Sequence, residues 1–186
     1  MNATNLTVVP DDDDGDGYGE AAEIVEFRDA VTGRPNLDPE AGALCALMQT
    51  PADLAHLVAA HLRPEDFYRP AHGELYAVIL DLVTTGKPHT AQAVMAKLEQ
   101  TGRIGGHLSK ILLDVVTADA IGADATHLAY AVIAAAYRRG YTIAADRLKQ
   151  HAAETDADEL FEAMCELGRE RREAEARFVA AREALQ

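Results

Sequence analysis

The stretch Leu62-Arg63-Pro64-Glu65-Asp66-Phe67-Tyr68-Arg69-Pro70-Ala71-His72 decides the fold. Its two prolines hold φ at about −65° and remove two amide donors, so neither a helix nor a strand runs through it. Phe67 and Tyr68 lie between the prolines, and burying a large ring is worth about 1.5 to 3 kcal/mol. We therefore expect at least one of these rings to be buried in the hydrophobic core. Glu65 and Asp66 follow the first proline as in a short helical turn, where carboxylates suit the positive end of the helix dipole.

Apolar residues recur at helical spacing on both sides of this turn. Asp38-Pro39 and Thr50-Pro51 are helix start signals, and Thr90 is another. Gly86 and Gly102 are stop signals. No segment alternates with period two over a useful length, so we predict an all-α fold with a compact bundle of about five short helices.

From Thr126 onward the pattern becomes long and alanine-rich, which predicts a long helix, with a small polar turn at 118–125 before it. A capping box at Asp156–Glu159 predicts the start of a second helix. Apolar residues in that helix follow a heptad seam, and Glu173 is spaced to pair with Arg169 and Arg177. A short connection between long helices predicts an antiparallel hairpin, whose apolar stripe is wide enough to need cover from another chain. The seam residues are Leu160, Met164, Leu167, Ala174, Phe178, Ala181 and Leu185, with Arg171 as the one break.

The central turn, with the segments around it, resembles the N-terminal domain of DnaB-type replicative DNA helicases. The run Pro-Glu-Asp-Phe-Tyr-Arg-Pro-Ala-His matches the family's signature turn, and Asp38 to Met48 is similar to its opening helix. Tyr130-Ala131-Val132-Ile133 with Arg138-Arg139 resembles the start of its long helical hairpin. The resemblance covers roughly residues 38 to 167. It assigns structural roles to Pro64, Glu65, Asp66, Phe67, Tyr68, Arg69, Pro70 and His72.

The resemblance implies a non-enzymatic protein-interaction module within DNA replication. In that family the hairpins pair between subunits, build a ring with threefold character and offer a docking surface to the helical C-terminal domain of primase. We therefore expect self-association, and binding of primase or a replicative helicase, with no cofactor. The partner-binding candidates are Tyr130, Tyr137, Arg138, Tyr141, Leu160, Met164, Leu167 and Phe178.

The family's ATPase motor is not found in this sequence. The one Gly-Lys pair, Gly86-Lys87, lacks the earlier glycine and is followed by proline, so no phosphate-binding loop is present. The 118–125 connection also departs from the family, which commonly has Pro-Ser/Thr and an Asn there. The sequence thus resembles the N-terminal domain, or collar, of the helicase without its ATPase motor domain. Neither a catalytic serine constellation nor a catalytic carboxylate pair is expected.

The amino-acid composition indicates which binding partners and which cellular compartment to expect. The 186 residues contain 31 acidic and 17 basic side chains, for a net charge of −14, so the surface should repel a phosphate backbone and direct DNA binding is disfavoured. Cys45 and Cys165 lie among apolar helix residues, as free thiols of a reducing compartment do. No signal peptide or long apolar span is present. We expect a cytoplasmic, soluble protein.

The first 36 residues are acidic and glycine-rich, and we expect a largely disordered tail there. The predicted organisation is this tail at 1–36, a globular helical subdomain at 37–125 and the hairpin at 126–186. Asp12, Asp14, Asp16 and Glu23 fit the spacing of an EF-hand calcium loop. Pro10 precedes that loop where an entering helix would lie, and any Asp-rich run produces this pattern easily.

Histidine patterns give no metal site. His56 and His61 are five residues apart and face different ways, without a cysteine or carboxylate to complete a tetrahedral zinc set. We expect His72 to be a first-turn residue hydrogen-bonded near the Pro70 corner.

Two rival functions remain open beside the helicase collar. One is a free-standing regulator that joins or blocks a host replicative helicase ring. The other is a calcium-responsive adaptor that acts through the acidic tail.

Overall fold

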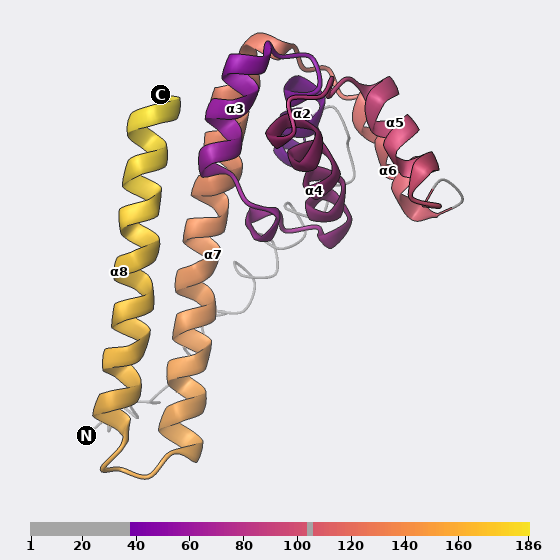
Figure 1. Ribbon diagram of the computed structural model, residues 1–186. Helices are drawn as coiled ribbons and strands as arrows, with labels where there is room; N and C mark the ends of the chain where they lie inside the picture. Colours follow the sequence, from indigo (N-terminus) through magenta and orange to yellow (C-terminus); the bar gives the residue numbers. More distant parts are fainter. Residues whose placement is uncertain (1–37, 104–105) are drawn as a thin grey trace, which may run out of the picture.

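The computed structural model describes residues 38–103 and 106–186, and every regular element in these ranges is helical. A bundle of short helices is followed by a long antiparallel hairpin (Figure 1), so the predicted all-α architecture is confirmed. The elements are α2 (Pro39–Leu47), α3 (Ala52–His61), the 3-10 turn η2 (Pro64–Asp66), α4 (Pro70–Thr84), α5 (Ala91–Gln100), α6 (His107–Val116), the 3-10 turn η3 (Gly122–Asp124), α7 (Ala125–Glu154) and α8 (Leu160–Leu185).

Helix boundaries follow local chemistry. The Asp38 side chain accepts a hydrogen bond from Glu40 N at 3.0 Å, and Thr90 accepts one from Ala93 N at 3.4 Å. Each satisfies an amide that a helix start would leave unpaired. Gly86 and Gly102 have φ of 66° and 70°, in the left-handed region that favours glycine, and they follow the ends of α4 and α5.

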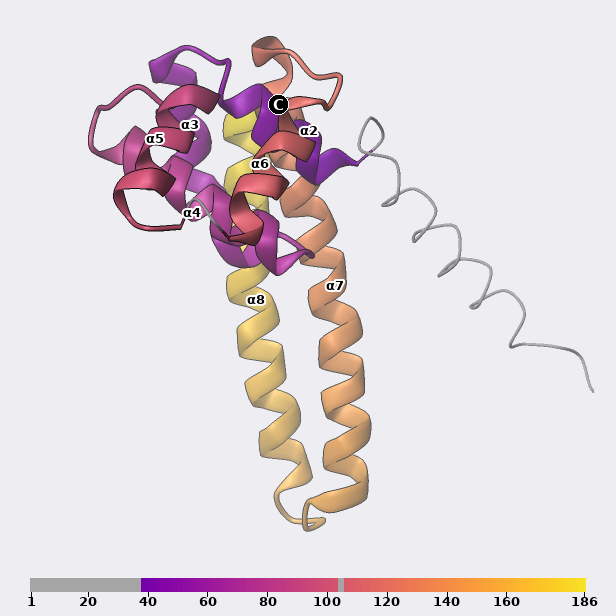
Figure 2. The same cartoon turned by 90° about the vertical axis from the view of Figure 1, so that its right-hand side faces the viewer.

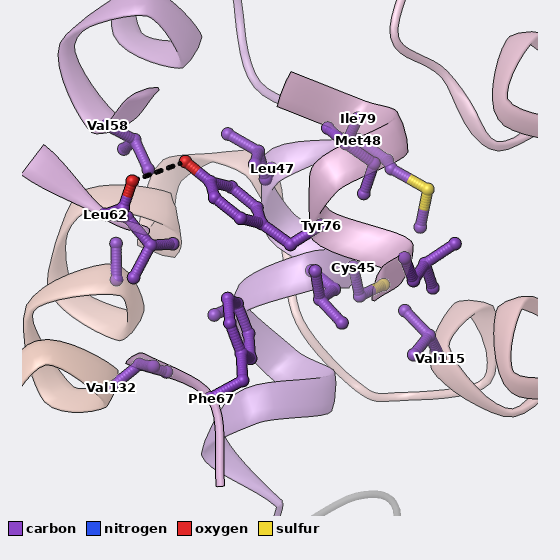
Figure 3. Packing of buried hydrophobic residues seen from close by; sticks show 14 of the residues in the cluster. Cys45, Leu47, Met48, Val58, Leu62, Phe67, Tyr76, Ile79, Val115 and Val132 are labelled. Carbon is purple, nitrogen blue, oxygen red and sulfur yellow. Dashed lines mark hydrogen bonds between the residues drawn. The ribbon is translucent and has the colours of Figure 1, made fainter. Parts of the chain in front are cut away.

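Helix α4 supplies the centre of the core. Tyr76 is fully buried, and its hydroxyl donates to the Leu62 carbonyl at 3.0 Å (Figure 3). The Phe67 ring lies beside it, with ring centroids 5.3 Å apart, and is 6% exposed. Tyr68 is 65% exposed. The stretch 62–72, called the motif turn below, thus buries one of its two rings in the core, as predicted, and leaves the other at the surface.

The two long helices run side by side in opposite directions. The first half of α7 packs against α2 and α3, and the end of α8 returns to α3, where Ala181 and Leu185 are buried. The far halves of both helices extend beyond α2 to α6 (Figures 1 and 2). The base of the hairpin is therefore anchored on the bundle, and among the described helices the outer half of α7 packs against the outer half of α8.

The second long helix follows Asp156–Glu159 as predicted, but the capping box predicted there does not form. The helix begins at Leu160, and Glu159 precedes it without a side-chain cap. The Glu159 amide instead donates to the backbone carbonyl of Asp156 at 3.0 Å. A backbone turn has therefore taken the place of the expected capping box.

The predicted ion pairs of Glu173 do not form either. Arg169 lies 2.8 Å from Glu162, and Arg177 pairs with Asp66 in the motif turn. Arg177 takes the distant partner because Asp66 is buried and its charge needs compensation, whereas Glu173 is exposed to water.

Candidate functional site

Glu40 of α2 organises the motif turn from the inside. Glu40 is 8% exposed, and its carboxylate accepts hydrogen bonds from the backbone amides of Tyr68 and Arg69, while His72 Nδ1 lies 2.9 Å from Oε2. Burial raises the pKa of Glu40, but the hydrogen bonds from His72 and the two amides outweigh it, so the pKa lies below its usual range. His72 is therefore hydrogen-bonded at the Pro70 corner, and its partner Glu40 was not identified from the sequence.

Asp38, Glu40 and His72 could be mistaken for a metal centre. They are buried, and their ligand atoms lie within 4.8 Å of one another. However, Asp38 Oδ1 accepts from the Glu40 amide, and Oδ2 forms an ion pair with Arg69 Nη1 at 3.0 Å. Asp38 is thus already paired with a guanidinium, although its buried Oδ2 accepts no hydrogen bond, and Glu40 already accepts from two backbone amides. Hydrogen bonds and ion pairs within this cluster connect α2 to the motif turn.

Asp66 attaches the same turn to the hairpin. Its carboxylate accepts from Arg63 N at 2.9 Å and from both terminal nitrogens of Arg177 in α8 at 2.8 and 2.5 Å. Arg139 of α7 donates to the Asp66 carbonyl at 2.6 Å, and its guanidinium lies 5.7 Å from the centre of the Tyr68 ring. The motif turn is thereby bonded to both helices of the hairpin.

An aromatic stack joins α7 to α8. The Phe178 ring lies 4.5 Å from that of Tyr137 at an interplanar angle of 4°, and 5.7 Å from that of Tyr130. Tyr137 also meets the ring of Tyr141 edge-on, and their hydroxyls are 2.9 Å apart. This hydrogen bond raises the pKa of Tyr137 to about 12. Three of the predicted partner-binding residues, Tyr130, Tyr137 and Phe178, therefore stack within the hairpin, and a fourth, Tyr141, contacts the edge of this stack.

The other predicted partner-binding residues divide between the interior and the surface. Leu167 is buried at 8% exposure, and Leu160 is partly buried. Tyr141 is 48% exposed and Met164 47%, and Arg138 also faces solvent. Three further large apolar side chains on the outer hairpin are exposed and were not among those predictions: Ile143, Leu148 and Phe161.

Four of these exposed apolar residues lie along one side of the hairpin. The side of α7 that faces α8 passes through Tyr137 and Ala144 and is the seam of this helix. At 100° per residue, Tyr141 and Leu148 lie on one side of the seam, and Arg147 lies on the other. By the same geometry, Met164 and Phe161 lie on one side of the α8 seam and Glu170 on the other. Arg147 and Glu170 pair at 3.2 Å, which shows that their two sides form a common flank.

The opposite side, with Tyr141, Leu148, Phe161 and Met164, is called the free flank here. Arg139 and Arg177, which bind the motif turn, project from the other flank. An open polar groove lies on that other flank near the hairpin tip, lined by Arg147, His151, Glu154, Glu166 and Glu170 among others. The free flank therefore faces away from the bundle and carries four of the five exposed large apolar side chains of the outer hairpin, all but Ile143.

Other predictions lie outside this region. Asp12, Asp14, Asp16 and Glu23 fall outside the described residues. Cys45 is a buried free thiol, and Cys165 is a partly buried one. Within residues 38–103 and 106–186, no helix combines the length and apolarity needed to cross a membrane.

Comparison with known proteins accounts for this arrangement. A 66-residue segment is 46% identical to the replicative DNA helicase DnaB of Mycobacterium leprae (strain TN), and it spans 33% of this chain and 11% of that relative. The crystal structure of the N-terminal domain of DnaB helicase from Mycobacterium tuberculosis superposes with a TM-score of 0.59 at 30% identity, covering 74% of this chain and 99% of that one. The DnaB-like helicase N terminal domain family matches residues 34–134. The chain belongs to this family of replicative-helicase N-terminal domains.

Proposed function

We propose that the chain is a non-enzymatic interaction module of the DNA-replication machinery that associates with itself through the free flank of its hairpin. The observation that carries this proposal is the row of large apolar side chains on that flank, which the chain's own bundle leaves uncovered. Phe161 is 71% exposed, and Tyr141, Leu148 and Met164 are each more than 40% exposed.

The free energy of burying apolar side chains favours contact between the free flank and another chain. Burying each such side chain is worth about 1.5 to 3 kcal/mol, and exposed apolar residues gathered on one surface mark interaction sites. From Tyr141 to Glu154 the flank is about 20 Å long. Two such flanks, extended by the surrounding small residues, suit an interface between helical hairpins.

A second role, binding a primase or a replicative helicase, is supported by the family and by the hairpin's shape. A partner helix fits the groove between two exposed helices through its own apolar stripe. The net charge of −14 argues against direct DNA binding. A free-standing regulator of a helicase ring would use the same surfaces.

Light scattering tests self-association at about 10 to 100 µM, where weak protein contacts become populated. We expect the full chain to be a dimer or larger, and Tyr141→Ser with Met164→Ser to be monomeric. The matched control is Leu113→Ser with Val116→Ser, two exposed apolar residues of α6 outside the hairpin. A monomeric wild-type chain, or equal loss in the control, would overturn the proposal.

Addition of the chain to a replicative helicase and its primase separates the partner roles. A collar-like building block should enter or bind the complex while DNA unwinding continues. Arrest of unwinding would instead assign the regulator role, and absence from the complex would refute both.

A further inference from the structure

Arg171 is the one charged residue in the apolar seam of α8, and its side chain reaches the backbone of α7. A Cβ at Gly140 would overlap Nη1 of Arg171 and lie 3.1 Å from its Cζ, so the guanidinium lies directly against this glycine. Any other residue at position 140 would displace it. Glycine inside a helix costs about 1 kcal/mol relative to alanine, so the space for the guanidinium comes at the expense of α7 stability.

The Arg171 guanidinium has no anionic partner within the described part of the chain. It forms no ion pair there, and its Nε is buried without a hydrogen-bond acceptor. Glu175, one turn further along α8, is not within ion-pair distance of it. A charge held among apolar side chains without a partner is unfavourable, and an apolar residue at such a position is often equally or more stable.

The hairpin does not need Arg171 to align its two helices. The short connection 155–159 joins α7 to α8, and the pair of Arg177 with Asp66 attaches α8 to the bundle near its other end. These two restraints fix the register. A charged residue that breaks the seam pattern without serving the fold is typical of a functional position.

Two tyrosine hydroxyls lie near this guanidinium. Tyr137 and Tyr141 are on either side of Gly140 in the chain, and their hydroxyls are 2.9 Å apart at the hairpin surface. The hydrogen bond from Tyr141 is the largest cause of the raised pKa of Tyr137, and the positive charge of Arg171 opposes it, so the guanidinium acts on this hydroxyl. One hydroxyl proton bridges the two oxygens, which leaves the other proton free to be donated outward.

We propose that Arg171, together with the hydroxyls of Tyr137 and Tyr141, binds a phosphate group of a small molecule. The terminal nitrogens of a guanidinium donate to two phosphate oxygens, and the free hydroxyl proton is available to a third. The bound phosphate supplies the negative charge that the described residues do not bring to Arg171. The net charge of −14 repels a nucleic acid more strongly than a small anion. Tyr141 also belongs to the free flank, but this inference does not rest on self-association.

The test is an NMR titration of the full chain with inorganic phosphate at constant ionic strength. The amide signals of Gly140 and Arg171 should shift and saturate at about 1 to 10 mM phosphate, whereas that of Gly86 in the bundle should not. Arg171→Met keeps a long side chain without its charge and should weaken binding at least about tenfold. Gly140→Ala should do the same by displacing the guanidinium. Gly168→Ala makes the same change on α8, where a Cβ meets nothing within 4 Å, and should leave the affinity unchanged.

Further titrations identify the molecule that carries the phosphate. A nucleoside monophosphate that binds at least about tenfold more tightly than inorganic phosphate would assign the site to a nucleotide, and equal affinity would assign it to free phosphate. Shifts that grow without saturation, or an Arg171→Met variant that binds like wild type, would overturn the proposal. Acetate that binds as tightly as phosphate, or binding of a single-stranded oligonucleotide alone, would also overturn it.

Discussion

Arg177, two turns before the end of α8, donates hydrogen bonds to both carboxylate oxygens of Asp66, which lies 111 residues earlier in the motif turn. The Asp66 side chain is 4% exposed and that of Arg177 is 27% exposed. The pair therefore joins the family's signature turn directly to the second helix of the hairpin. With Arg139 on α7, it fixes how the hairpin leaves the bundle.

Arg177→Gln should lower the free energy of unfolding by about 2 to 3 kcal/mol, because it leaves the Asp66 charge buried without its partner. The double change Arg177→Gln with Asp66→Asn should cost less than the sum of the single changes. Urea denaturation measures all three. Arg172→Gln, at an exposed position of the same helix, is the control and should change stability by less than about 0.5 kcal/mol. Strict additivity would show that the pair does not couple.

Glu40→Gln should destabilise the chain at neutral pH by about 2 kcal/mol, since an amide cannot accept from every donor around the carboxylate. The folded-state pKa of Glu40 is lowered from 4.5, so its contribution is fully present above pH 4.5 and is lost as the pH falls through the folded-state pKa. The stability difference between wild type and variant should shrink in acid below pH 4.5. Glu65→Gln, at an exposed neighbouring position, is the control and should change stability at neutral pH by less than about 0.5 kcal/mol. A constant difference down to acid would contradict this role.

Local chemistry explains why so much of the bundle was predicted from the sequence. Asp38 and Thr90 mark helix starts, and Gly86 and Gly102 lie where the backbone needs positive φ. A proline lies at each end of the motif turn. Leaving the Phe67 ring exposed to water would cost free energy, which favours its burial. Each of these signals is contained within a few residues, so no knowledge of tertiary contacts was needed.

Long-range choices were the part that sequence reasoning missed. The heptad pattern showed that Phe178 faces another helix, but Tyr130 and Tyr137 of the same chain supply that helix. Glu173 was a nearer candidate for Arg177 than the buried Asp66. A periodic pattern specifies which residues need a neighbour, whereas the identity of that neighbour depends on packing between segments far apart in the chain.

Phe178→Ala should therefore act on the folding of a single chain. Loss of its stacked contacts should reduce the free energy of unfolding by about 3 kcal/mol, measured at a concentration low enough to keep the protein monomeric. Phe161→Ala makes the same change at a 71% exposed position and should cost less than about 0.5 kcal/mol. Equal effects at the two positions would mean that the stack does not stabilise the hairpin.

Gly73→Ala and Gly168→Ala should have opposite effects, although both positions are helical. A Cβ at Gly73 would lie 2.5 Å from the Pro64 carbonyl oxygen, a backbone atom of the motif turn, whereas one at Gly168 meets nothing within 4 Å. Alanine at 168 should stabilise by about 0.5 to 1 kcal/mol through helix propensity. Alanine at 73 should destabilise by about 2 kcal/mol, because the turn must move away from α4. Thermal unfolding of the two variants compares them, and a stabilised Gly73→Ala would show that the turn does not need this close approach.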